Sequence, residues 1–166
     1  GILLVDKPRG ITSHDVVDAL RKATRIRRIG HTGTLDPRAT GLLIMCIGHA
    51  TRLSEHFSDL EKTYEGTMRL GVVTKSHDMD GEIVSESPVP ETLTKDAVQE
   101  VCSRFVGDIE QIPPMVSAIK IGGKRLYKIA REGGEVQRQP RSVTIRHFDI
   151  MNWNPPEADI YVTCSS

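Results

Sequence analysis

Strand-like segments outnumber helix-like segments in this sequence, and several of them follow one another with no helix between them. Continuous or alternating apolar residues predict strands at Ile2–Val5, Leu42–Ile47, Lys62–Val73, Val143–Ile150 and Ile160–Cys164. Adjacent strands of this kind favour an α+β fold with a largely antiparallel sheet over a doubly wound parallel fold.

Helical spacing is confined to a few places. Thr12 or Ser13 can cap a helix whose apolar positions are Val16, Val17, Leu20 and Ala23. A second helix is predicted from Thr94 to Val106, and a shorter one from Ala50 to Leu60. Further along, Gly122-Gly123 is typical of a hairpin turn, and Leu126, Ile129 and Ala130 indicate a short helix.

The composition is that of an ordinary globular protein. A length of 166 residues is enough for one compact domain with a hydrophobic core. Hydrophobic residues make up 38% of the chain and charged residues 27%, as in ordinary globular proteins. No apolar run approaches the ~20 residues of a membrane helix. Three widely spaced cysteines fit neither a disulfide framework nor a zinc site, and the histidines show no ligand spacing, so we assign no metal. The sequence lacks an initiator Met, so we expect the natural N-terminus to lie upstream.

Charge is segregated along the chain although its net value is zero. Residues 1–52 carry nine Lys and Arg against four Asp and Glu, and residues 117–146 carry eight against two. The stretch between them, 53–116, carries five against thirteen. The two basic segments either form a common phosphate-binding face or are accidental clusters on a solvated surface.

The most unusual segment is a basic loop rich in Gly and Thr that runs from Arg25 to Gly41. Asp36 is its only acid, and Arg27, Arg28 and Arg38 lie around it in sequence. A carboxylate in such a setting is expected to be ionised and able to act as a nucleophile or an electrostatic stabiliser. The following proline restricts the backbone of Asp36 to extended conformations. The alternative is that Asp36-Pro37 is simply a turn.

A resemblance favours catalysis. Residues Gly30–Gly41 and the following leucine resemble the active-site signature G-H-x-G-x-L-D-P-x-A-x-G-x-L of the TruB family of pseudouridine synthases. Five other motifs resemble that family, in the same order along nearly the whole chain. The first three are Asp6-Lys7-Pro8 with Gly10 and Thr12-Ser13, Lys62-x-Tyr64 with Arg69-Leu70-Gly71, and Asp78-x-Asp80-Gly81. The last two are Gln111-x-Pro113-Pro114 with Ser117-Ala118 and Lys120, and Gly123-Lys124 with Leu126-Tyr127 and Ala130-Arg131.

The resemblance implies a pseudouridine synthase fold and a set of roles. Asp36 is the catalytic carboxylate, and Tyr64 stacks on the flipped uracil and serves in proton transfer. His31 fills the gap left by the flipped base, and Lys7 and Pro8 buttress the active-site loop. The remaining substrate and RNA-binding residues that it implies are Arg9, Thr32, Asp78, Lys120, Lys124 and Arg131.

The same resemblance implies a tRNA pseudouridine synthase that isomerises the T-loop uridine at position 55. It needs no cofactor, binds the T-arm stem-loop of tRNA, and works in the cytoplasm as a monomer without a membrane or an obligate protein partner. In the family, a Cys-Ser pair like Cys164-Ser165 precedes a segment that carries an arginine and a second tyrosine of the active site. We therefore expect residues 1–166 to be part of a catalytic domain that lacks its C-terminal part and any RNA-binding extension.

Two alternatives remain open. The chain could be an RNA-binding remnant that has lost catalysis, or a guide-RNA-dependent relative of the dyskerin type. The pattern between Gln111 and Gly133 resembles the bacterial stand-alone branch more than the guided one.

Overall fold

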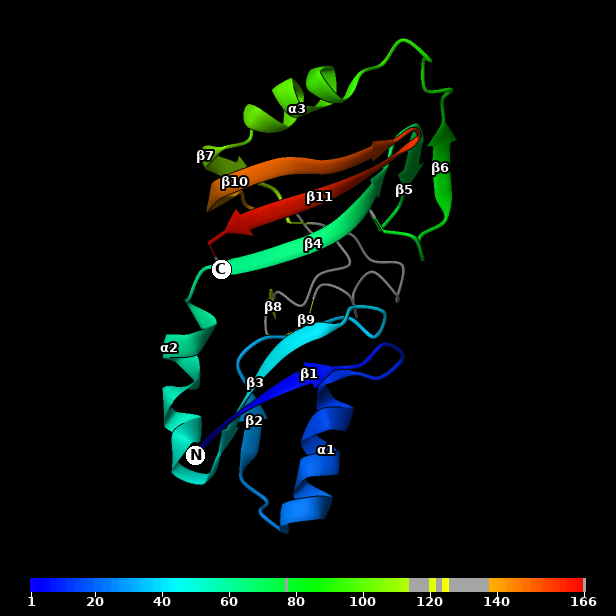
Figure 1. Cartoon of the computed structure of the whole chain (residues 1–166). Helices are drawn as coiled ribbons and strands as arrows, with labels where there is room; N and C mark the ends of the chain where they lie inside the picture. The colour runs from blue at the N-terminus through cyan, green and yellow to red at the C-terminus, as the bar shows by residue number, and fades with distance from the viewer. Residues whose placement is uncertain (77, 114–119, 122–123, 126–137, 166) are drawn as a thin grey trace. The chain divides into compact units, whose positions relative to one another are not determined.

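The computed structural model describes residues 1–76, 78–113, 120–121, 124–125 and 138–165 (Figure 1). Contacts between residues divide these into two compact units, residues 1–60 and residues 61–165. Each unit is built around its own core, and each is described by itself. The expectation that residues 1–166 form part of one catalytic domain stays a prediction.

Unit 1 is a three-stranded antiparallel sheet with one main helix. Its strands are β1 (Ile2–Lys7), β2 (Ile29–His31) and β3 (Gly41–Ile47), in the order β1-β3-β2. Helix α1 (Ser13–Thr24) packs on the sheet through a core made of Val16, Val17, Ile29, Leu43 and Met45. The 3-10 helix η1 (Gly48–Leu53) and the short α2 (Ser54–Ser58) follow β3.

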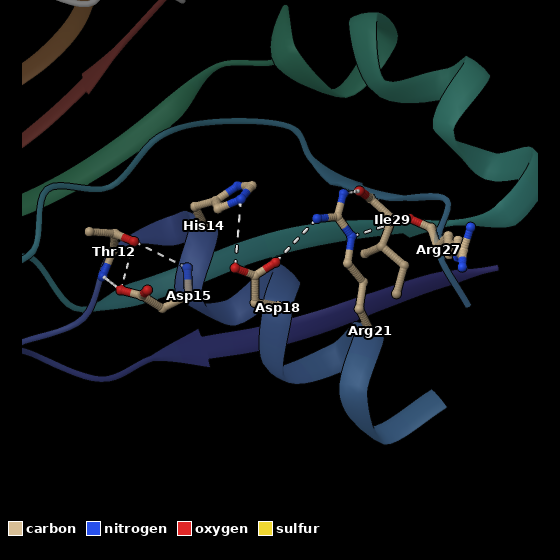
Figure 2. Close-up of polar contacts among 7 residues, drawn as sticks. All are labelled: Thr12, His14, Asp15, Asp18, Arg21, Arg27 and Ile29. Carbon is tan, nitrogen blue, oxygen red and sulfur yellow. Dashed lines mark hydrogen bonds and ion pairs between the residues drawn. The ribbon is translucent and has the colours of Figure 1, made fainter. Parts of the chain in front are cut away.

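Helix α1 is fixed at both ends by polar contacts (Figure 2). Thr12 caps its start, because the Thr12 hydroxyl accepts from the Asp15 amide and the Asp15 carboxylate accepts from the Thr12 amide. Near its end, Arg21 pairs with Asp18 at 3.1 Å and donates to the carbonyls of Arg27 and Ile29, which lead into β2. The orientation of α1 is thereby tied to the strand that precedes the loop.

Unit 2 is a four-stranded antiparallel sheet covered on one face by a helix. Its strands are β4 (Lys62–Arg69), β7 (Gly107–Gln111), β10 (Arg141–Asn154) and β11 (Glu157–Cys164), in the order β4-β11-β10-β7. Helix α3 (Lys95–Ser103) packs on β10 through Val98 and Cys102, and Ile150 and Ala158 complete this core.

Two small antiparallel pairs complete the described part of unit 2. They are β5 (Val72–Thr74) with β6 (Ile83–Glu86), and β8 (Lys120–Ile121) with β9 (Lys124–Arg125).

The α+β class is confirmed, and all strand pairs between described residues are antiparallel. The helix predicted to begin after Thr12 is present. One expected element was wrong: the strand predicted over Lys62–Val73 ends at Arg69, because Gly71 turns the chain with a φ of 80°. The predicted Gly122-Gly123 turn and the helix near Leu126 lie outside the described residues.

The capping contacts predict a pH-dependent stability. The Thr12 hydroxyl also donates to the Asp15 carboxylate, at 2.7 Å. This hydrogen bond, and then the one from the Thr12 amide, lower the pKa of Asp15 below its ordinary value of 3.8. A lowered folded-state pKa contributes stability that is present above 3.8 and is lost as the pH falls through the folded value. We expect Asp15→Asn to lower the Tm at neutral pH and to match the wild type in strong acid. A Tm difference that stays constant from neutral to acid pH would contradict this account of the cap.

Candidate active site

The loop that carries Asp36 joins β2 to β3, and its first residue is fixed by two hydrogen bonds. The Thr32 amide donates to the Ile44 carbonyl at 3.1 Å, and the Thr32 carbonyl accepts from the Ser58 hydroxyl at 2.7 Å. The Thr32 side chain is 8% exposed. At the other end Gly41 enters β3 with a φ of 118°, a left-handed conformation that favours glycine.

The centre of the loop is a tight turn. The Ala39 amide donates to the Asp36 carbonyl at 3.0 Å, which closes a four-residue turn with Pro37 in its second position. Proline is favoured there because its fixed φ suits the turn. Asp36-Pro37 is therefore a turn, and this turn leaves the Asp36 side chain exposed.

Residues of the connection between β1 and α1 hold this turn through hydrogen bonds to its backbone. The Lys7 side chain is 0% exposed, and its ammonium donates to the carbonyls of Ile11 at 2.8 Å, Pro8 at 3.1 Å and Pro37 at 3.5 Å. The Gly10 amide also donates to the Pro37 carbonyl, at 2.7 Å. These contacts hold the Pro37 carbonyl from the connection between β1 and α1, and the buttressing role of Lys7 and Pro8 stays a prediction.

Sequence reasoning missed a second support. The Ser13 hydroxyl donates to the Leu35 carbonyl at 3.2 Å and accepts from the Leu35 amide at 2.9 Å. Ser13 is 2% exposed and begins α1. The sequence pointed to Ser13 only through its place beside Thr12 in the motif Asp6–Ser13. A local sequence pattern cannot predict a hydrogen bond between residues that are 22 positions apart.

The Asp36 carboxylate has no hydrogen bond or ion pair with any side chain in the described part of the chain. Arg27 and Arg28 precede β2, and the Arg28 guanidinium donates instead to the Thr51 hydroxyl at 2.7 Å. Arg9 is exposed beside the turn and donates to the Arg38 carbonyl at 3.2 Å. Among the described residues the loop thus carries an exposed carboxylate without a side-chain partner, and Arg9 and Arg38 lie next to the turn.

His31 ends β2 opposite Met45, directly before the loop. Its Nδ1 atom is buried and has no hydrogen-bond partner among the described residues. An unpaired buried polar atom is costly in a folded protein and is often found where function requires it. The role predicted for His31 is not tested by this geometry.

Tyr64 lies in unit 2, on β4, where it faces Val162 across the strand pair. Its side chain is 47% exposed. Burial of the remainder, with a smaller effect of Cys164, raises the pKa of the phenol above 10.0. The phenol is therefore neutral at physiological pH, and it could accept a proton only if substrate or a further group activated it.

The other predicted residues belong to unit 2 or lie outside the described residues. The Asp78 carboxylate accepts from the Ser76 hydroxyl and from the amides of Asp80 and Gly81, which holds the turn between β5 and β6. Lys120 and Lys124 lie on β8 and β9, and Arg131 lies outside the described residues. The two basic segments fall in different units, so a common phosphate-binding face stays a prediction.

In the described part of the chain, no group of three or more His, Cys, Asp or Glu side chains could hold a metal ion. In the same residues no helix has both the length and the apolar character needed to cross a membrane.

Comparison with known proteins identifies one family. The family model described as TruB family pseudouridylate synthase (N terminal domain) matches residues 21–166. A protein of Opitutus terrae named tRNA pseudouridine synthase B is 50% identical over 165 residues, which cover 99% of this chain and 68% of that protein. A protein of the same name from Pseudomonas aeruginosa is 46% identical over 165 residues, and the chain spans only 54% of its length.

Solved structures show the same fold. One such structure is described as a Cbf5-Nop10-Gar1 complex. This chain superposes on a chain of that complex with a TM-score of 0.72 and 26% sequence identity, and the match covers 100% of this chain and 40% of the other. A structure described as an H/ACA RNP bound to a substrate RNA containing 2'-deoxyuridine gives a TM-score of 0.66 at 24% identity, covering 99% of this chain and 38% of that one.

The buried ammonium of Lys7 yields a stability prediction. Lys7→Met keeps the length of the side chain but removes the ammonium donor from the carbonyls of Pro8 and Ile11, while the Pro37 carbonyl keeps its bond from the Gly10 amide. The substitution also removes the cost of burying a charge. Buried groups left unpaired cost about 1–3 kcal/mol, so we expect a net loss of that order in urea unfolding of the full-length protein. The exposed Lys22→Met is the control and should change the free energy of unfolding by less than about 0.5 kcal/mol. A Lys7→Met protein as stable as the wild type would mean that the carbonyl contacts only offset the cost of burying the charge.

Proposed function

Because the chain belongs to the TruB family of pseudouridylate synthases, we propose that its full-length protein isomerises the T-loop uridine of tRNA, at position 55, to pseudouridine, with Asp36 as the reacting carboxylate. The chain spans 68% and 54% of the lengths of the two relatives described above, so the proposal concerns a protein longer than these residues.

One observation carries the proposal: residues from elsewhere in unit 1 hold the loop through its backbone groups, while the Asp36 carboxylate is left exposed and unpaired among the described residues. A carboxylate buried in a structural ion pair would have to break that pair before reacting. This carboxylate needs no such step, so its charge is available to a substrate that docks on the loop.

The reaction fits a carboxylate without other reagents. The bond between uracil N1 and ribose C1′ breaks, the ring turns, and a bond forms between C5 and C1′. C5 loses its proton to solvent and N1 takes one up, so the protons balance. No atom is gained or lost and no electron is transferred. Asp36 serves either as the nucleophile or as the electrostatic stabiliser of the separated sugar and base.

The uridine must leave the RNA stack before Asp36 can reach it, which costs a few kcal/mol. In this proposal Tyr64 stacks on the flipped uracil and His31 occupies the space that the base leaves. Arg9, Lys120, Lys124 and Arg131 contact the RNA backbone, and Thr32, Pro8 and Asp78 shape the loops around the substrate. Lys7 contributes indirectly, by holding the Pro37 carbonyl.

We propose further that the enzyme acts as a monomer in the cytoplasm, on the T-arm stem-loop, without an obligate protein partner. The names of the two relatives support tRNA as the substrate, whereas the two solved structures described above are complexes. Incubation of the purified full-length protein with a tRNA transcript labelled with tritium at uridine C5 tests this. Release of tritium without any other protein or RNA supports the proposal. Binding without release would favour the catalytically inactive remnant, and release only on addition of guide RNA and partner proteins would favour the guided class.

Asp36→Asn should abolish tritium release and leave tRNA binding largely intact. The substitution keeps the shape of the side chain and removes its charge, and no contact within the described residues depends on that charge. Turnover and binding are measured on the same full-length preparation, by tritium release and by filter binding. Appreciable turnover by Asp36→Asn would contradict the role of Asp36.

Tyr64 should separate stacking from proton transfer. Tyr64→Phe keeps the ring and its stacking, worth roughly 1–3 kcal/mol, and loses only the hydroxyl, so we expect a loss of catalysis much larger than any loss of binding. Tyr64→Leu removes the ring face and should lose both. Single-turnover rates and the Kd for tRNA are compared for the two variants. If Tyr64→Phe reacts at the wild-type rate, the hydroxyl has no chemical role and the proton acceptor lies elsewhere.

A further inference from the structure

Ser13 is the side chain that holds the peptide group directly before Asp36. Its hydroxyl bonds both polar backbone groups of Leu35, the amide at 2.9 Å and the carbonyl at 3.2 Å, and it is 2% exposed. We propose that Ser13 is a positioning residue for the Asp36 carboxylate. This inference rests on the function proposed above, and it assigns Ser13 no contact with substrate.

Ser13 is itself held firmly. It is the first residue of α1, directly after Thr12, whose capping contacts with Asp15 are drawn in Figure 2. The next apolar residues of the helix, Val16 and Val17, are 6% and 2% exposed in the core of unit 1. The hydroxyl therefore projects from a rigid element, which makes it a fixed reference point for the loop.

The direction of the Asp36 side chain depends on the backbone on both sides of its Cα atom. Downstream, Pro37 limits the conformation of Asp36, and the Pro37 carbonyl is held by Gly10 and Lys7. Upstream, the Leu35 carbonyl belongs to the peptide group that ends at the Asp36 amide, and Ser13 holds that carbonyl. Ser13 thus completes the restraint that Pro37 begins, and without it the upstream peptide group could rotate.

Removing the hydroxyl should affect the chemical step more than RNA binding. The loop surface and its arginines would persist, but a misplacement of a reacting group by about 1 Å can slow a reaction about 100-fold. We expect Ser13→Ala to lower kcat about 10- to 100-fold with little change in KM. Ser13→Cys keeps a weak donor of similar shape and should recover part of that loss.

Thr24 offers a matched control on the same helix. Its hydroxyl also donates to a carbonyl, that of Leu20 at 2.7 Å, and accepts from an amide, that of Ile26 at 3.3 Å, but both partners lie outside residues 32–40, which join β2 to β3. Thr24→Val should leave kcat unchanged. Val98→Ala removes buried volume from the core of unit 2, a different core from the one that anchors α1, so it controls for lost stability alone and should keep its kcat below its unfolding temperature.

The experiment compares these variants of the full-length protein by tritium release and by hydrogen exchange of the Leu35 amide. The inference predicts a lower kcat and about tenfold or more faster Leu35 exchange in Ser13→Ala, and neither change in Thr24→Val. A wild-type kcat in Ser13→Ala, or an equal fall of kcat in Val98→Ala, would overturn it. If the wild type released no tritium, the proposed function would fail. Unchanged Leu35 exchange in Ser13→Ala would still refute the positioning role in that case.

Discussion

The ammonium of Lys7 is buried where the connection between β1 and α1 meets the loop between β2 and β3. Burying a charge is unfavourable unless every donor finds an acceptor, so the carbonyls of Pro8, Ile11 and Pro37 must converge on it. Two of these belong to the connection between β1 and α1, and the third belongs to the loop between β2 and β3. The contact at Pro37 is the longest, at 3.5 Å, and the Gly10 amide reinforces it at 2.7 Å.

This convergence explains why the loop keeps one shape without a strand or helix of its own. Its backbone groups at Thr32, Leu35 and Pro37 are all occupied by residues from elsewhere in unit 1. The Asp36 carboxylate, by contrast, is exposed and has no internal partner among the described residues. A charge placed in advance by the fold does not have to be reorganised during a reaction, which is the physical basis for assigning catalysis to Asp36.

The sequence predicted most of this and missed what depends on tertiary contacts. Apolar runs and the Thr12 cap predicted the main strands and α1, and the motif around Asp36 predicted the loop. It missed β7 of the four-stranded sheet and the exposed β6. It also missed β2, whose three residues lie among glycines and arginines and are held by pairing with β3. Ser13 was recognised as a cap candidate, but its bonds to Leu35 depend on the packing of α1 against the sheet. Arg28 was expected near Asp36, and its contact with Thr51 reflects the turn of the chain into η1.

A crystal structure of the full-length protein bound to a T-arm RNA would test the central claim most directly. We predict that the loop keeps its backbone contacts with Lys7, Gly10 and Ser13, and that the Asp36 carboxylate lies about 3–3.5 Å from the reacting atoms of the flipped uridine. A loop that abandons these contacts on binding, or a uridine that meets a different carboxylate, would contradict the view that the fold positions Asp36 in advance.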